Sequence, residues 1–378
     1  MNVQHTREGS AMKKFRVGII GAGDIAVMHA QAYGELAEEC ELVAIADTDE
    51  DRARRLVEAA GTEVETFADY RRLLEREDID IVSVCTPPYV REAPIVAALA
   101  AGKHVMAEKP LAASLEECDA MLEAAAKYNR KLAVMLQTRF ELSVRQIRHL
   151  VASGAIGEPL FASAANHHWR GERYYGKPWR GTWERERGGV LMNLGIHTLD
   201  VLLWTLGELS AVRANMATLG NRIETEDAAA ASLKFTCGAL AQFVCTTTHP
   251  VDGSSLEISG RSRMVRYPLS FAAYAQNDAG YPMRDAAAEV ELAQAADAYA
   301  LAAEEVTEGF AGPIRDLFAA IREDREPITG GLSVRRTIEA VTAIYKSAAT
   351  GAEVRLPIGR DDACYTTDGL HRLMKTIK

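Results

Sequence analysis

Residues 15–26 read Phe15-Arg16-Val17-Gly18-Ile19-Ile20-Gly21-Ala22-Gly23-Asp24-Ile25-Ala26, an apolar strand that runs directly into a glycine-rich turn. Each part of this stretch can contribute to binding a dinucleotide. The first glycine permits a tight turn, the second lets the backbone approach a pyrophosphate, and Ala26 lets the following helix pack close to the strand. The free N–H groups at the start of that helix, with its positive dipole end, would face the phosphates. The stretch therefore predicts a cofactor contact formed by Gly21, Gly23, Asp24 and Ile25.

The next strand, residues 42–46, ends on Asp47, about 20 residues beyond the glycine-rich turn. An acidic side chain at this place accepts hydrogen bonds from the adenosine ribose hydroxyls. A 2′-phosphate there would meet like charge, so NAD is expected as cofactor in preference to NADP. Arg52 and Arg54 lie nearby in sequence and leave use of both cofactors open. The alternative for the whole motif is a glycine turn in an ordinary α/β domain.

The composition narrows the class of protein. The chain has 378 residues, 48% hydrophobic and 25% charged, which favours a globular protein of two domains. Its formal net charge of −10 argues against a partner that is nucleic acid or a membrane surface. Six scattered cysteines without Cys-x-x-Cys spacing predict reduced thiols, with neither a disulfide framework nor a metal site.

The first residues of the chain carry no apolar run. Residues 1–13 are therefore expected to form a disordered extension and not a signal peptide. No later segment is apolar enough to span a bilayer, so the expected location is the cytoplasm.

Short β-rich runs alternate with longer helical ones through residues 14–137, which is the pattern of a parallel sheet. With the two strands above, the runs make six strands and predict a doubly wound Rossmann domain that binds its ligand at the carboxyl ends of the strands. The further strands are expected at residues 63–67, 79–85, 104–107 and 132–136.

Three of these expected strand ends carry candidate site residues. Thr86 and Pro87 follow the fourth strand, Glu108 and Lys109 follow the fifth, and Gln137 comes at the end of the sixth. Most lysines are solvated surface charges. Lys109, however, comes directly after a strand and before a proline, so we expect its ammonium group to point into the cofactor crevice.

These residues, with the run Gly188–Asp200, resemble the Gfo/Idh/MocA family of sugar and cyclitol oxidoreductases over residues 14 to about 357. The resemblance implies an α/β protein with an N-terminal Rossmann domain (residues 14–137). A C-terminal α/β domain (residues 138–378) with a large, mostly antiparallel open sheet would bind substrate and mediate oligomerisation. The resemblance also implies that Lys109 contacts the reacting hydroxyl and that His197 is the acid/base.

The residues around His197 support that role independently. Asn193 and His197 are four apart and are expected to share one helical face, with Asp200 three further on. The unperturbed pKa of histidine, near 6.5, suits proton transfer from an alcohol at neutral pH, although a histidine near an apolar helix can equally be structural. Asn193 stands where many family members have Asp, and an amide cannot stabilise imidazolium by charge. Arg91 stands where family members often have His, which leaves its role open.

An aromatic and basic segment, residues 167–183, precedes these motifs and holds three of the four tryptophans. Aromatic faces stack on sugars, while Arg and Lys bind hydroxyls, carboxylates or phosphates. The resemblance implies that Trp179 and Arg180 approach the nicotinamide and that Tyr175 contacts substrate. The segment is most similar to members that oxidise the C3 hydroxyl of UDP-linked N-acetylhexosaminuronic acids. A loop that packs over the core or at a subunit contact is the alternative.

The remaining half of the chain predicts strands and two helical regions. The helical regions are residues 289–320, interrupted near 309–313, and residues 334–349. Small residues and threonines in the strands indicate a broad face that packs on another sheet or on a partner, so we expect a homodimer or homotetramer. The strands are expected at residues 211–216, 228–235, 239–248 and 256–259.

The expected function is hydride transfer between NAD and a secondary alcohol or ketone of a sugar, sugar acid, nucleotide sugar or cyclitol. Lys109 would hold the substrate oxygen, His197 would take the proton, and Asn193 and Gln137 would position sugar or nicotinamide. Three alternatives remain: a keto- or anhydro-sugar reductase, an inositol or glycoside dehydrogenase, and a non-catalytic NAD-binding regulator.

Overall fold

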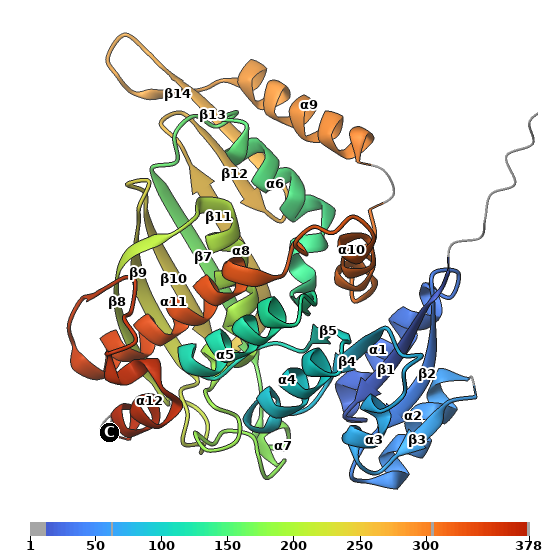
Figure 1. The fold of residues 1–378 in the computed structure, drawn as a ribbon. Helices are drawn as coiled ribbons and strands as arrows, with labels where there is room; N and C mark the ends of the chain where they lie inside the picture. Colours follow the sequence, from blue (N-terminus) through green and yellow to red (C-terminus); the bar gives the residue numbers. More distant parts are fainter. Residues whose placement is uncertain (1–12, 62, 304–305, 376–378) are drawn as a thin grey trace, which may run out of the picture.

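A computed structural model describes residues 13–61, 63–303 and 306–375 (Figure 1). The extension expected at residues 1–13 therefore lies outside the described residues, apart from Lys13. No helix in the described ranges is long and apolar enough to cross a membrane. The six cysteines are unpaired, and five of them are buried.

The N-terminal half forms a six-stranded parallel sheet in the order β3-β2-β1-β4-β5-β6, as predicted. The order reverses between β1 and β4, and this switch point is where doubly wound folds bind ligands, beyond the strands' carboxyl ends. The strands are β1 (Phe15–Ile20), β2 (Cys40–Ala46), β3 (Glu65–Phe67), β4 (Ile81–Val84), β5 (His104–Ala107) and β6 (Leu132–Val134).

Helices connect these strands, as parallel pairing requires. Ser114 caps the last of them, since its hydroxyl accepts a hydrogen bond of 3.2 Å from the N–H of Glu117. The helices are α1 (Asp24–Glu35), α2 (Glu50–Ala60), α3 (Tyr70–Leu74), α4 (Glu92–Ala100) and α5 (Leu115–Lys127), with 3-10 turns at η1 (Pro88–Val90) and η2 (Gln137–Phe140).

The C-terminal half forms a nine-stranded, mostly antiparallel sheet in the order β14-β13-β12-β11-β7-β10-β9-β8-β15. Among the described strands of this second sheet, only the pairing of β7 with β10 is parallel. The predicted strands correspond to β8–β11, whereas β12, β13 and β14 lie partly exposed and lack a clear alternation. The strands are β7 (Phe161–Trp169), β8 (Leu209–Ala217), β9 (Ala228–Phe235), β10 (Leu240–Thr246), β11 (Thr248–Ser259), β12 (Arg263–Tyr267), β13 (Ser270–Gln276), β14 (Pro282–Arg284) and β15 (Val354–Arg355).

The helices that pack on this sheet include α6 (Leu142–Ala152), α8 (Ile196–Leu206) and α11 (Gly331–Thr350) (Figure 1). The site-bearing segment before α8 is a π-helical turn, η3 (Leu191–Gly195), and a short helix, α7 (Glu172–Tyr175), follows β7. The chain ends with η4 (Ala363–Tyr365) and α12 (Thr367–Met374).

The helical region expected at residues 289–320 is two helices, α9 (Ala286–Ala302) and α10 (Ala311–Arg322). Helix α10 packs against the N-terminal sheet, where Leu317 and Phe318 join the core that contains Val17 and Ile19. The rings of Phe15 and Phe318 lie 4.9 Å apart. A segment from beyond residue 300 thus completes the core beside β1.

Candidate active site

The glycine-rich turn has the geometry that the sequence predicts. Gly21 has φ +93°, and a Cβ there would lie 3.0 Å from the backbone carbon of Cys85, so glycine is required. Nothing lies within 4 Å of where a Cβ of Gly23 would be, which leaves room for a ligand above the start of α1. The N–H of Ala22 donates a 2.6 Å hydrogen bond to Oδ2 of Asp47, so this carboxylate braces the turn and keeps further acceptor capacity.

Three predicted site residues carry buried polar atoms that have no hydrogen-bond partner in the described part of the chain: Thr86 Oγ1, Gln137 Oε1 and His197 Nδ1. Buried polar atoms are nearly always paired, so the unpaired ones that follow β4 and β6, on Thr86 and Gln137, and the one on His197 in α8 indicate a ligand that pairs them. Together with the space above Gly23, these atoms fit a bound NAD.

Lys109, at the end of β5, reaches across to the other domain. Its Nζ donates to the backbone oxygen of Asn193 at 2.6 Å and lies 3.3 Å from Oδ1 of the same residue. His197 follows one turn later, at the start of α8. The structure therefore brings Lys109 to Asn193, and the charge of Lys109 acts on His197.

Charges and burial shift the pKa of Lys109 strongly. Burial is the main reason that this pKa falls to about 8. The positive charges of Arg91 and Arg180 lower it further, whereas the carboxylates of Glu108 and Glu186 raise it. An ammonium group with this pKa exchanges its proton near neutral pH.

Asn193 is held by side chains that the sequence analysis missed. Its Nδ2 donates to Oε1 of Glu186 at 2.8 Å and to the Tyr174 hydroxyl at 2.7 Å. Arg180 bonds the same Tyr174 hydroxyl and lies 3.3 Å from Glu186. Burial raises the pKa of Glu186. In the sequence, Glu186 stands among the arginines of residues 180–187, which could have indicated a buried ion pair. Nothing in the sequence distinguished it from the other charged residues there.

His197 begins helix α8 directly after the π-helical turn, a feature that often marks functional sites. Burial, and then the charge of Lys109, lower its pKa to about 3, so its imidazole is neutral at physiological pH. His197 also lines a small cavity of about 90 Å³ between α8 and β11.

Asp200 is not part of this group, although the sequence places it on the same helical face. Its buried carboxylate receives two hydrogen bonds of 2.6 and 2.7 Å from Arg139 and one of 2.7 Å from Thr337. Through these hydrogen bonds Asp200 connects α8 to η2 and α11.

Glu108 lies behind the crevice, with its side chain only 3% exposed. One carboxylate oxygen lies 3.1 Å from Nε2 of His29, and the other accepts from the N–H of Lys109 at 3.0 Å. Burial raises the pKa of Glu108, but the hydrogen bond and charge of His29 outweigh it, so the group stays ionised. Any cofactor contact by Glu108 would therefore use its backbone.

The remaining predicted residues lie around this centre. Asp24 forms an ion pair with Lys177 from the other domain, and this lowers the pKa of Asp24. The guanidinium of Arg180 lies over the Trp179 ring at 4.5 Å. The Tyr175 hydroxyl is 3.0 Å from Thr247 Oγ1. Tyr174, its neighbour, is the tyrosine that contacts Asn193.

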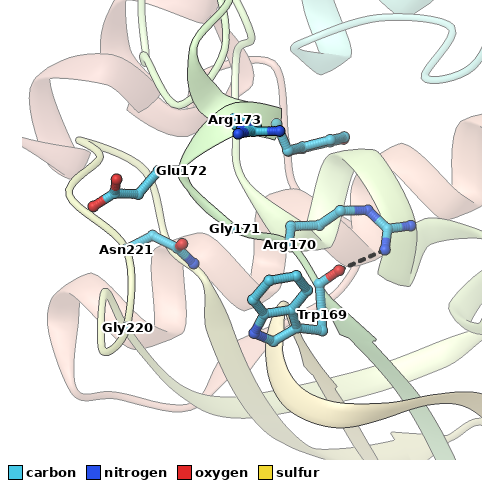
Figure 2. A pocket seen from close by; sticks show the side chains of 8 residues that line it. Trp169, Arg170, Gly171, Glu172, Arg173, Gly220 and Asn221 are labelled. Atoms are coloured by element: carbon cyan, nitrogen blue, oxygen red, sulfur yellow. Dashed lines mark hydrogen bonds between the residues drawn. The ribbon is translucent and has the colours of Figure 1, made fainter.

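An open pocket of about 640 Å³ lies next to Tyr174 (Figure 2). Trp169 and Arg170 at the end of β7 lie on one side of it, Glu172 and Asn221 lie together on the other side, and Arg173 lies at the start of α7. The Trp169 side chain is 60% exposed. Among the described residues, no group of three His, Cys, Asp or Glu side chains is arranged to hold a metal ion.

Comparison with known proteins gives two family matches. A model described as an oxidoreductase family with an NAD-binding Rossmann fold matches residues 15–136. A model described as the GFO/IDH/MocA C-terminal domain matches residues 144–266.

Individual relatives are dehydrogenases. The chain is 35% identical to the D-glucoside 3-dehydrogenase of Escherichia coli over 56% of this chain and 59% of that protein. It is 30% identical to the myo-inositol 2-dehydrogenase of Thermotoga maritima over 60% of this chain and 66% of that protein. These matches thus span somewhat under two thirds of each relative.

Among solved structures, the WlbA dehydrogenase of Chromobacterium violaceum, in complex with NADH and UDP-GlcNAcA, superposes with a TM-score of 0.79. It is 27% identical, and the match covers 92% of this chain and 97% of that one.

Proposed function

Because the chain belongs to the Gfo/Idh/MocA family of NAD-binding oxidoreductases, we propose that it oxidises a secondary alcohol of a sugar or related polyol to the ketone, reversibly. The observation that carries this proposal is the contact of Lys109 Nζ with Asn193, one turn before His197. It supports a reaction centre between the domains, beside the carboxyl ends of β4 and β5.

Bound NAD would supply the hydride acceptor, held by Gly23, Asp47, Thr86 and Gln137. The substrate hydroxyl would lie between Lys109 and His197. The pKa of Lys109, about 8, matches proton transfer at neutral pH better than that of His197, about 3. We therefore assign the proton to Lys109 and a hydrogen bond that orients the hydroxyl to His197, the reverse of the roles expected from the sequence.

The first test is NADH formation from NAD with a panel of inositols, glycosides, aldoses and UDP-sugars. With a responding substrate, Lys109→Ala and His197→Ala should each lower kcat by at least roughly 10²-fold with NAD binding retained. Lys127→Ala, on the exposed side of α5, is the matched control. Near-normal kcat in both site variants would reject the assignment. NAD binding without turnover across the panel would favour a non-catalytic regulator.

The substrate class that we propose is a UDP-linked sugar acid. The open pocket supports it, because Trp169 offers an exposed ring for stacking and Arg170 and Arg173 offer cations for phosphate or carboxylate. Similarity to WlbA, whose structure contains UDP-GlcNAcA, supports the same class.

Arg173→Ala tests this substrate class. The variant should raise KM for UDP-GlcNAcA about 10-fold, while leaving the KM of a substrate without phosphate, such as myo-inositol, unchanged. An equal effect on both substrates would show that the pocket does not recognise the anionic group.

We further propose that the chain forms a homodimer or homotetramer through the face of the nine-stranded sheet opposite α8 and α11. On β7 and β10, the register partners Phe161 and Leu240 are 46% and 50% exposed, which supports an apolar contact there. The unpaired, mostly buried cysteines support a cytoplasmic location.

A further inference from the structure

Arg91 is a buried cation, 4% exposed, at the start of α4. Its Nε and Nη2 donate to the carbonyl oxygen of Thr86 at 3.1 and 2.5 Å, and its Nη1 donates to the carbonyl oxygen of Pro110. These partners are neutral carbonyls on two different loops. The guanidinium thus ties the loop after β4 to the loop after β5.

A buried charge is costly unless something offsets it. Burial lowers the pKa of Arg91 to about 10, and the carboxylates that oppose this shift, Glu108 and Glu117, act through charge without a hydrogen bond to the guanidinium. Neutral donors could bridge two carbonyl groups at lower cost. Joining the two loops therefore does not by itself explain why a charged side chain is buried at position 91.

The loop after β5 carries Lys109, directly before Pro110. We propose that Arg91 is a positioning residue of the reaction centre: through its hydrogen bonds to the carbonyl oxygens of Thr86 and Pro110 it holds the Lys109 loop against the Thr86 loop, and it adds a positive charge to the surroundings of the Lys109 ammonium group. This inference rests on the proposed role of Lys109 in the reaction.

The surroundings of Lys109 single out Arg91 among the nearby cations. Arg180 also faces Lys109, but its guanidinium is within 3.3 Å of Glu186, which offsets much of its charge. Glu108 is itself paired with His29. Among the described residues, no carboxylate forms an ion pair with Arg91, so its charge is less compensated than that of Arg180, in line with the lowered pKa of Lys109.

The test measures the pKa of Lys109 directly, in the full chain with NAD bound. The rate at which acetic anhydride labels Lys109, followed by peptide mass spectrometry across pH, reports the neutral fraction of this amine. Arg91→Gln keeps a donor and removes the charge, and it should raise the pKa of Lys109, giving about 10-fold slower labelling at pH 7. Arg91→Lys keeps the charge and should leave the labelling curve close to that of the wild type.

Arg91→His, neutral above about pH 7, is a second charge-removing variant, and it should shift the curve in the same direction as Arg91→Gln at alkaline pH. An unshifted Lys109 curve in a folded charge-removing variant would overturn the inference. The alkaline pKa of kcat/KM should move with the labelling curve. Labelling of Lys109 does not require turnover. If no sugar were oxidised but Arg91→Gln still shifted the labelling curve, the proposed function would be refuted and the inference about Arg91 would stand.

Discussion

Asn193 contacts side chains on both sides of the candidate active site. Its amide donates to Glu186 and Tyr174 and its oxygens face Lys109, so both ends of the side chain are used. An aspartate at position 193 would have no N–H group to donate to the Glu186 carboxylate. The carboxylate next to Asn193 is that of Glu186, which accepts from the Asn193 amide.

Asn193→Asp should therefore harm this protein even though Asp is common in relatives. Two carboxylates at hydrogen-bond distance cannot both ionise, so we expect a loss of about 1–3 kcal/mol in unfolding free energy at pH 8 and a smaller loss at pH 5. Urea unfolding measures this. Adding Glu186→Gln restores a donor and should recover most of the loss, and Glu186→Gln alone is the control. A fully stable Asn193→Asp variant would contradict the arrangement.

At the scale of the element, the start of the site-bearing helix depends on one buried carboxyl group. Glu226 accepts from the N–H groups of Gly189 and Leu191 at 3.0–3.1 Å and from the Tyr345 hydroxyl at 2.9 Å. A Cβ on Gly189 would lie 1.9 Å from the Glu226 carbonyl oxygen, so the chain must have glycine there. These contacts orient η3 and α8, and with them Asn193 and His197.

Burial raises the pKa of Glu226 to about 7, above its value near 4.3 in an unfolded chain. A raised pKa means that stability is fully present at pH values below about 4 and is lost as pH rises through 7. Compared with Glu226→Gln, which cannot ionise, the wild type should lose roughly 2–3 kcal/mol of unfolding free energy between pH 5 and pH 8. Urea unfolding at both pH values checks this, and parallel pH dependences would contradict it.

At the scale of the whole molecule, the C-terminal sheet has one face covered by helices and one open face. The open face predicts self-association, which light scattering measures as a mass of two or four chains. Leu240→Asp, a charge on that face at the start of β10, should shift the mass toward one chain, whereas Leu332→Asp, 69% exposed on α11, should not. A wild type that remains a single chain at high concentration would reject the proposed interface.

The Rossmann sheet, its glycine-rich turn and the strand-end residues were predictable from the sequence because their signals are local. The turn, the helix start and the strand alternation lie within a few residues of one another, and Asp47 follows from the next strand end. Strands β12–β14 and the π-helical turn were not predictable, since short exposed strands carry little alternation and a widened turn leaves no periodic pattern.

Contacts between segments far apart in the sequence could not be predicted and became known only from the tertiary structure. Lys109 and Asn193 are 84 residues apart, and the ion pair that removes Asp200 from the site joins residues 61 apart. Helix α10 returns from beyond residue 300 to cover β1. Local chemistry sets which strand end is suited to a cofactor. Only the tertiary structure decides which charged side chains are buried together beside that strand end. It therefore decides the pKa of Lys109 and the buried positions of Glu186 and Arg91.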